Sequence, residues 1–136
     1  MTNIIESVSQ FSKRYDVLFC DIWGCIHDGK FAFPNALNAL SDFRKNGGYV
    51  MLLTNAPRPK AAVKKHLKSM DITEEFFDDI TTSGDAAQVC MFSGKVGYNI
   101  YHLGPKQDES FFTDFPKDIH FYQEIVRVPL EESEGI

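Results

Sequence analysis

Two polar residues stand directly after apolar segments that have the composition of buried strands. Asp21 follows the run Val17-Leu18-Phe19-Cys20, and Thr54 follows Tyr49-Val50-Met51-Leu52-Leu53. In an open parallel sheet, ligands bind beyond the carboxyl ends of the strands, where helix amino termini favour an anion. A carboxylate at this edge can attack phosphorus, and it can hold Mg2+ together with waters and substrate oxygens. The hydroxyl of Thr54 and the amide of Asn55 could bind the other phosphoryl oxygens.

The same residues also have a purely structural interpretation. An aspartate after a strand commonly forms an Asx turn, and a threonine or asparagine there commonly caps the next helix. Their positions alone leave both interpretations open, so the surrounding elements and motifs must decide.

The elements that would position these residues alternate between strand and helix patterns. Apolar spacing and turn residues predict helices over 3–13, from Pro34 to the pair Gly47-Gly48, over 60–69 and from Ser83, with a brief helical piece at Phe111-Phe112. Apolar runs predict strands at 17–20 and 49–53, both buried on two faces, a short strand at 79–82 and a further strand at 98–103. This order is typical of a parallel α/β sheet with right-handed crossovers.

The composition limits the class of protein. The chain has 136 residues, 43% of them hydrophobic and 24% charged, which suits one folded domain and excludes a disordered tail. A net charge of −5 argues against nucleic-acid and anionic-membrane partners. Neither a spanning apolar segment nor a signal-peptide pattern is present. We expect a soluble, cytoplasmic protein that acts on a small molecule.

The three cysteines, Cys20, Cys25 and Cys90, have no disulfide-framework spacing. Cys20, Cys25 and the nearby His27 could suggest zinc, but a structural zinc site needs a second ligand pair, which the sequence lacks. Reduced and mostly buried thiols are the better interpretation.

Four motifs resemble those of one enzyme superfamily. The segment Asp21-Ile22-Trp23-Gly24-Cys25-Ile26-His27-Asp28-Gly29 resembles the first motif of the haloacid dehalogenase-like (HAD) hydrolases, and Leu52-Leu53-Thr54-Asn55-Ala56-Pro57-Arg58-Pro59 resembles the second. The later segments 80–87 and 101–105 follow in the order of the class IIA branch, which includes NagD-like sugar phosphatases and p-nitrophenylphosphatases. The resemblance implies a three-layer α/β/α Rossmann-like sheet and a Mg2+-dependent phosphatase.

The resemblance also implies roles for individual residues. Asp21 matches the nucleophile, which takes the phosphoryl group as an aspartyl-phosphate and ligates Mg2+. The backbone carbonyl of Trp23 matches the second metal ligand. Thr54 and Asn55 match the phosphate site, and Gly24 matches the tight turn beside it. The implied substrate is a small phosphorylated metabolite.

Trp23 departs from the family pattern. The family's usual second aspartate, which protonates the leaving group, would stand at this position. An indole N–H is only a hydrogen-bond donor and cannot transfer a proton at neutral pH. The form Asp-x-Trp-Gly resembles that of a subset of class IIA-like sequences and is interpreted as a variant of the motif. His27 and Asp28 are possible substitutes for the missing acid.

The resemblance implies two parts of unequal completeness. Residues 1–93 match the amino-terminal part of the catalytic core, and residues 94–136 match the start of a class IIA cap domain. Nothing after residue 94 resembles the family's downstream lysine and acidic motifs, so the chain resembles an amino-terminal half. Half a sheet would leave an exposed edge strand and an uncovered apolar face. We therefore expect a homodimer, a complementing second half, or marginal stability.

Two other functions remain as alternatives. Trp23 and the missing downstream motifs fit a HAD-like remnant that binds phosphate or a partner without turnover. A receiver-like signalling domain shares the size and the parallel sheet. That class, however, carries its phospho-acceptor on the third strand and a carboxylate pair after the first, which Asp21 with Trp23 fits poorly.

Overall fold

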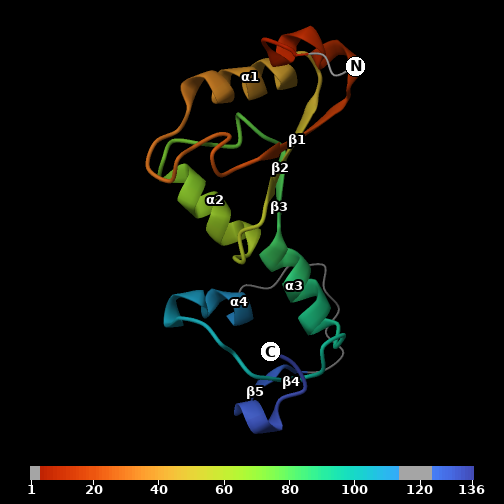
Figure 1. Cartoon of the computed structure of the whole chain (residues 1–136), viewed down its shortest axis with the longest axis vertical. Coiled ribbons are helices and arrows are strands. Elements are labelled where there is room, and N and C mark those ends of the chain that lie inside the picture. The colour runs from red at the N-terminus through yellow and green to blue at the C-terminus, as the bar shows by residue number, and fades with distance from the viewer. Residues whose placement is uncertain (1–3, 114–123) are drawn as a thin grey trace. The chain divides into compact units, whose positions relative to one another are not determined.

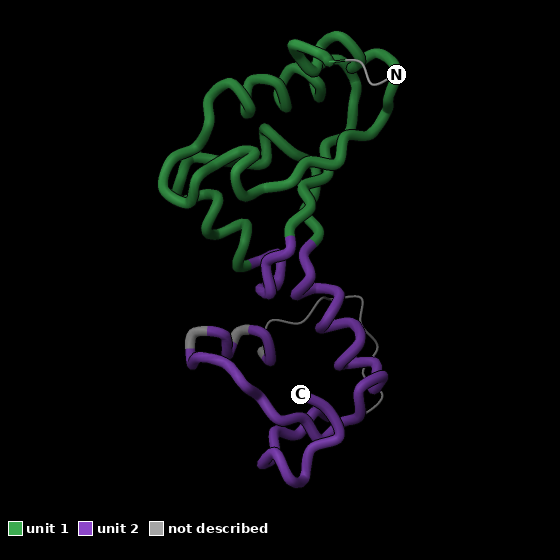
Figure 2. The backbone as a smooth tube through the Cα atoms, viewed as in Figure 1, with its two compact units in different colours: residues 1–54, 62–81 green, residues 55–61, 82–136 purple. Residues whose placement is uncertain are grey.

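The computed structural model describes residues 4–113 and 124–136, and the chain divides into two compact units (Figure 2). Unit 1 takes in the residues up to Thr54 together with Ala62–Thr81. Unit 2 takes in Asn55–Ala61 together with the residues from Thr82 onward. The expected boundary between residues 93 and 94 concerns a core and a cap domain, and it stays a prediction.

Unit 1 is built on a three-stranded sheet with the order β1-β2-β3. The strands are β1 (Val17–Asp21), β2 (Tyr49–Thr54) and β3 (Asp79–Thr82). β1 and β2 run parallel, with Val17 opposite Tyr49 and Asp21 opposite Leu53. Helix α1 (Pro34–Lys45) connects β1 to β2, and α2 (Lys60–Lys68) connects β2 to β3. This is the Rossmann-like parallel α/β fold that the alternating pattern predicts, in an incomplete form.

Both helices form where local sequence favours them. α1 begins with proline at its first turn, where the missing N–H costs nothing, and Gly47 follows its end with a φ of +88°. Its apolar stripe of Leu37, Leu40 and Phe43 is buried, as are Val63 and Leu67 of α2. The predictions of helices from Pro34 and over 60–69 are thus confirmed to within a residue or two.

The two helices lie on the same side of the sheet (Figure 1). Among the residues that face them, Val50, Leu52 and Ile80 are at most 1% exposed. On the opposite face the apolar side chains are open to solvent, and Phe19 is 66% exposed. The prediction that the first two strands are buried on both faces is therefore wrong, because only one face has a helical layer. The uncovered apolar face expected of half a sheet is present.

The predicted opening helix over 3–13 is also wrong. The described part of this segment contains only two short 3-10 turns, η1 (Val8–Gln10) and η2 (Ser12–Arg14). Its serines bond locally instead of capping a helix: the Ser7 and Ser9 hydroxyls pair at 2.7 Å, and the Ser12 hydroxyl donates to the Ser9 carbonyl. Such bonds compete with helix formation.

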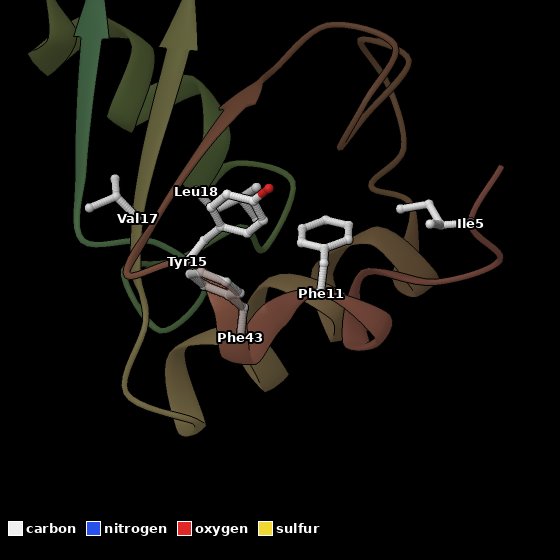
Figure 3. A pocket seen from close by; sticks show the side chains of 6 residues that line it. All are labelled: Ile5, Phe11, Tyr15, Val17, Leu18 and Phe43. Carbon is white, nitrogen blue, oxygen red and sulfur yellow. The ribbon is translucent and has the colours of Figure 1, made fainter. Parts of the chain in front are cut away.

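The opening segment, β1 and α1 line an open apolar pocket of about 440 Å3 (Figure 3). The pocket lies at the amino end of β1, beside Val17, whereas Asp21 is at the carboxyl end. Its other lining residues are Ile5, Phe11, Tyr15, Leu18 and Phe43. Because the lining carries no charged group, this pocket is poorly suited to bind a phosphate.

The longest helix of unit 2 among the described residues is α3 (Ser83–Phe92). It starts at Ser83, as the sequence predicts. The Thr82 hydroxyl accepts the Asp85 amide at 2.9 Å and caps this helix. A small core joins Met91 and Phe92 to Ile100. The remaining elements are β4 (Asn99–Ile100), η3 (Lys106–Asp108), α4 (Ser110–Thr113), β5 (Val126–Arg127) and η4 (Leu130–Glu132).

The strand predicted over 98–103 is much shorter than expected. β4 covers only Asn99–Ile100, which pairs in parallel with Val126–Arg127. The Tyr101 amide already leaves the ladder and donates to the Gly135 carbonyl at 2.9 Å. The helical piece expected around Phe111 and Phe112 is confirmed as α4.

The cysteines differ from expectation in their exposure. All three are free, but Cys25 and Cys90 are exposed and only Cys20 is half-buried. Cys25 lies in the turn after β1, and Cys90 lies on α3. Within the described ranges, no helix has the length and apolarity that crossing a membrane would require.

Candidate active site

Asp21 is the last residue of β1, and its side chain is exposed at the carboxyl edge of the sheet. One carboxylate oxygen, Oδ1, accepts the backbone N–H of Ile22 at 2.7 Å. By strand alternation its side chain lies on the same face as Val17 and Phe19, the face that α1 and α2 leave uncovered. The carboxylate is thus held by its own backbone and directed to open space.

The turn after Asp21 is anchored by buried apolar residues. Ile22 is 3% exposed, and its carbonyl accepts the amides of Cys25 and Ile26. Gly24 has a φ of +75°, a conformation that favours glycine, and its N–H donates to the His27 carbonyl at 2.8 Å. The chain can therefore turn sharply after Asp21, which agrees with the tight turn expected at Gly24.

Trp23 stands on this turn with its side chain 66% exposed. Its ring meets the His27 ring edge-on, with centroids 5.6 Å apart. Gly29 lies under the same ring, because a Cβ built there would be 2.5 Å from Trp23 Cη2. No described residue donates a hydrogen bond to the Trp23 carbonyl. This oxygen therefore has room for another partner.

His27 is buried, with 2% of its surface exposed, inside the loop that follows the turn. Its Nδ1 accepts the Gly29 amide at 2.9 Å, which fixes the proton of the neutral ring on Nε2. Burial, followed by the neighbouring His66 charge, lowers the pKa of His27. A neutral, buried ring that holds its own loop together is poorly suited to protonate a leaving group.

Asp28 is exposed, but its carboxyl group is unsuited to act as the general acid for a different reason. Its Oδ1 accepts the amides of Lys30 and Phe31, each at 2.8 Å. The hydrogen bonds from Phe31 and then Lys30 lower the pKa of this carboxyl group. Asp28 is therefore ionised at neutral pH, where a general acid must carry a proton.

Thr54 ends β2 one residue after Leu53, the register partner of Asp21. Neighbouring strands lie roughly 4.8 Å apart, so the sheet brings Asp21 and Thr54 to the same edge. Asn55 follows directly but belongs to unit 2, where its carbonyl accepts the Ser83 hydroxyl at 3.1 Å. A role for the Asn55 side chain beside Asp21 stays a prediction.

His66 is a neighbour of this loop that the sequence did not indicate. It lies on α2, and its ring meets the His27 ring with centroids 5.9 Å apart. The spacing along α2 shows an apolar stripe and a basic face but carries no sign of a partner on a loop. In the described part of the chain, no three His, Cys, Asp or Glu side chains gather where they could hold a metal ion. Among the described residues, this edge offers a cation the Asp21 carboxylate and backbone oxygens.

Comparisons with known proteins identify the family. The sequence model of the haloacid dehalogenase-like hydrolases matches residues 18–115, from the second residue of β1 to just past the end of α4. The chain belongs to this family. A comparison with curated proteins gives no match.

A solved structure supports the same assignment. The chain is similar to a haloacid dehalogenase-like hydrolase from Brucella suis 1330, with a TM-score of 0.80 and 28% sequence identity. The similarity covers 96% of this chain but only 44% of the Brucella chain. The chain thus spans less than half the length of this HAD-like relative.

Proposed function

We propose that the chain forms part of a Mg2+-dependent phosphomonoester phosphatase of the HAD class IIA branch, with Asp21 as the nucleophile. The observation that carries this proposal is the position of Asp21, which is exposed at the carboxyl edge of the parallel sheet, the edge at which Thr54 ends the neighbouring strand. In such sheets this edge is where ligands bind. Membership of the HAD-like hydrolases supports the same chemistry.

The reaction has two steps. An Asp21 carboxylate oxygen attacks the phosphorus of a small phosphorylated metabolite, and the ester P–O bond breaks as its electron pair departs with the leaving alkoxide or phenoxide. Water then attacks the aspartyl-phosphate, which releases inorganic phosphate and restores the carboxylate. The Thr54 hydroxyl and the Asn55 amide would donate hydrogen bonds to the phosphoryl oxygens, and Gly24 would let the backbone turn close to them.

The available donors fit Mg2+. This ion keeps several waters and binds proteins through one or two carboxylates together with substrate phosphate. Asp21 would supply the carboxylate and Trp23 its carbonyl oxygen, which accepts no hydrogen bond from the described residues. When bound, Mg2+ would neutralise negative charge on the phosphoryl group.

Trp23 narrows the substrates that such a site can use. The indole cannot protonate a leaving group, and the geometry of His27 and Asp28 suits neither to that task. The site would therefore favour phosphate esters whose leaving group departs without a proton. Aryl phosphates belong to this class, whereas simple alkyl phosphates do not.

A direct assay tests the proposal. The chain is incubated with p-nitrophenyl phosphate, with and without Mg2+, beside Asp21→Asn and the control Asp42→Asn. Asp42 is exposed on α1, and its side chain forms an ion pair with Lys45 at 3.8 Å. Turnover that needs Mg2+, survives in Asp42→Asn and disappears in Asp21→Asn supports the proposal. Turnover that persists in Asp21→Asn excludes Asp21 as the nucleophile.

The second candidate is a HAD-like phosphate-binding protein without turnover. It is favoured by Trp23 at the acid position and by the 44% share of the Brucella chain that this chain covers. Titration with inorganic phosphate and Mg2+ distinguishes the two, with binding observed by NMR at the amides of residues 21–24. Binding that needs Asp21, without hydrolysis of p-nitrophenyl phosphate, would select this candidate.

A further inference from the structure

Asn46 and Gly47 form the only Asn-Gly dipeptide in the sequence, and they directly follow the last residue of α1. Both residues are exposed. The side chain of an asparagine can react with the backbone nitrogen of the next residue, and the side-chain amide is then replaced by a carboxylate. Glycine as the next residue favours this reaction, because it has no Cβ to obstruct the approach of its nitrogen. Asn46 thus has the sequence context of a deamidation site.

The reaction needs only water as a co-reactant. A base removes the proton of the Gly47 amide, and the nitrogen attacks Cγ of Asn46. The bond between Cγ and Nδ2 breaks, Nδ2 takes up a proton and leaves as ammonia, and a succinimide ring remains. Water then opens the ring at one of its two carbonyl carbons, which gives either aspartate or isoaspartate. No group is oxidised or reduced.

The folded structure keeps the two reacting groups apart. The Gly47 N–H donates to the Arg44 carbonyl at 2.9 Å, and Nδ2 of Asn46 donates to the Asp42 carbonyl at 2.8 Å. The ψ angle of Asn46 is 11°, so the Gly47 nitrogen lies beside the backbone nitrogen of Asn46 and is turned away from its Cβ. Ring closure requires rotation about this backbone bond, and the rotation breaks the hydrogen bond to Arg44.

The residues after Gly47 oppose this rotation. The Gly48 N–H donates to the Phe43 carbonyl at 3.1 Å, and Gly48 lies against the buried Phe43 ring. The Tyr49 N–H donates to the Asp16 carbonyl at 2.8 Å, where β2 begins. The connection from α1 to β2 is therefore held on both sides of Gly47. The side chain of Asn46 can meet the Gly47 nitrogen only when the last turn of α1 opens.

We propose that Asn46 is a site of spontaneous deamidation and that opening of the last turn of α1 sets its rate. Helix ends open at a lower free energy than the whole fold does. The reaction is therefore slow in the folded chain, and it reaches the rate of an unstructured Asn-Gly segment only in molecules whose last turn has opened.

The site is separate from the candidate active site. Tyr49, which follows Asn46 closely, pairs with Val17 at the start of β1, whereas Asp21 ends that strand. Asn46 and Asp21 thus belong to opposite ends of the sheet. The proposal does not rest on the proposed function, and its test does not depend on turnover.

Deamidation would weaken the end of α1. A carboxylate cannot donate the hydrogen bond that Nδ2 of Asn46 gives to the Asp42 carbonyl. It also places a negative charge at the negative end of the helix dipole, one turn from the exposed Asp42 carboxylate. Isoaspartate in addition lengthens the main chain in the connection to β2. The products therefore favour the open form of the helix end that carries Arg44.

The test follows the change in mass of each asparagine. The chain is incubated in mildly alkaline buffer with and without urea, and peptide mass spectrometry measures deamidation over time. Asn35 and Asn38 are internal controls, because both are exposed on α1 and precede alanine. In urea we expect Asn46 to react at least about tenfold faster than either control. Without urea, Asn46 should react at least about tenfold more slowly than in urea.

A variant tests the control by the helix end. Asp78→Ala removes the carboxylate that pairs with Arg44 and should speed the reaction of Asn46 without urea by at least about threefold. Glu132→Ala is the control, because it removes an exposed carboxyl group of unit 2, and its rate should match that of the parent chain. Circular dichroism establishes that both variants are folded.

Three results would overturn the proposal. If Asn46 reacts no faster in urea than Asn35 and Asn38, it is not a preferred site. If Asn46 reacts as fast in the folded chain as in urea, the last turn of α1 does not protect it. If the folded Asp78→Ala variant reacts at the rate of the parent chain, the opening that limits the reaction does not involve the Arg44 end of α1.

Discussion

Arg44 and Asp78 form a two-point ion pair that joins the end of α1 to the segment before β3. Arg44 Nε lies 3.0 Å from Asp78 Oδ2, and Nη2 lies 2.7 Å from Oδ1. The same Oδ2 accepts the Val50 amide at 2.7 Å, at the start of β2. One carboxylate therefore connects a helix, a central strand and the loop that leads to the next strand.

This geometry predicts a large loss of stability on truncation. Asp78→Ala should lower the free energy of unfolding by about 1–3 kcal/mol, because it leaves the Val50 amide without its acceptor and removes the carboxylate that pairs with Nε and Nη2 of Arg44. Asp42→Ala, on the exposed side of α1, should change it little. Urea denaturation followed by circular dichroism measures both. Equal effects of the two substitutions would mean that the ion pair adds nothing beyond an exposed one.

The same pair predicts a pH dependence. The hydrogen bonds from Arg44, with a smaller contribution from the Val50 amide, lower the pKa of Asp78. The stabilisation is thus complete above the unfolded-state pKa of about 3.9 and is lost as the pH falls through the lower pKa of the folded state. The stability difference between the parent chain and Asp78→Asn should shrink from pH 5 to pH 2. A constant difference over this range would contradict the assigned pKa direction.

The helices and strand positions of unit 1 could be predicted because their signals are local. These signals are the proline at the start of α1, the glycine after its end, and the apolar stripes that include Leu37 in α1 and Leu67 in α2. Each of them depends on residues only a few positions apart. The burial of the strands could not be predicted. An apolar run such as Val17–Cys20 is the same whether its second face meets a helix or solvent, and that depends on what lies across the sheet.

The candidate site was predictable only in part for the same reason. Asp21 and Thr54 lie at the same edge of the sheet because they end neighbouring parallel strands, which follows from the order of the elements. The ring contact between His27 and His66 and the contact between Trp23 and Gly29 depend on the path of a loop in space. The periodicity of apolar residues in the sequence does not predict the path of a loop.

Trp23→Asp tests the proposed preference for good leaving groups. A carboxyl group at this position could protonate a leaving alcohol, and general acid catalysis typically contributes ~10²–10⁴-fold. We expect kcat/KM for an alkyl phosphate such as glycerol phosphate to rise at least about 100-fold relative to kcat/KM for p-nitrophenyl phosphate. The assay uses the preparation that turns over p-nitrophenyl phosphate.

Trp23→Asn is the matched control for that substitution. Asparagine has nearly the shape of aspartate and removes the same ring from His27 and Gly29, but it cannot act as an acid. The Trp23→Asn variant should therefore keep the parent chain's preference between the alkyl phosphate and p-nitrophenyl phosphate. If both variants shift the preference equally, the cause is space in the loop and not proton transfer.

Gly84→Ala should destabilise unit 2, against the usual trend for glycine in a helix. A Cβ at this position would lie 2.5 Å from the carbonyl carbon and oxygen of Arg58 and 2.6 Å from the carbonyl oxygen of Pro57. These are backbone atoms that cannot rotate away, so we expect a loss of about 1–3 kcal/mol. Helix propensity alone would give a gain of roughly 0.5–1 kcal/mol.

Ala86→Gly in the same helix supplies the comparison for that prediction, because Ala86 is exposed and reports propensity alone. Thermal unfolding followed by circular dichroism measures both variants. If Gly84→Ala stabilises by about as much as Ala86→Gly destabilises, the segment 57–58 does not pack against α3 as described.

The three thiols should differ in their reaction with iodoacetamide. Burial, followed by the effects of Cys25 and Asp21, raises the pKa of Cys20 to about 11. At pH 8 this residue is almost entirely the unreactive thiol, whereas Cys25 and Cys90 are exposed to the reagent. Peptide mass spectrometry over a time course should show Cys20 modified at least about tenfold more slowly than either, with the difference abolished in urea. Early modification of Cys20 in the folded chain would show that β1 opens readily at its carboxyl end, next to Asp21.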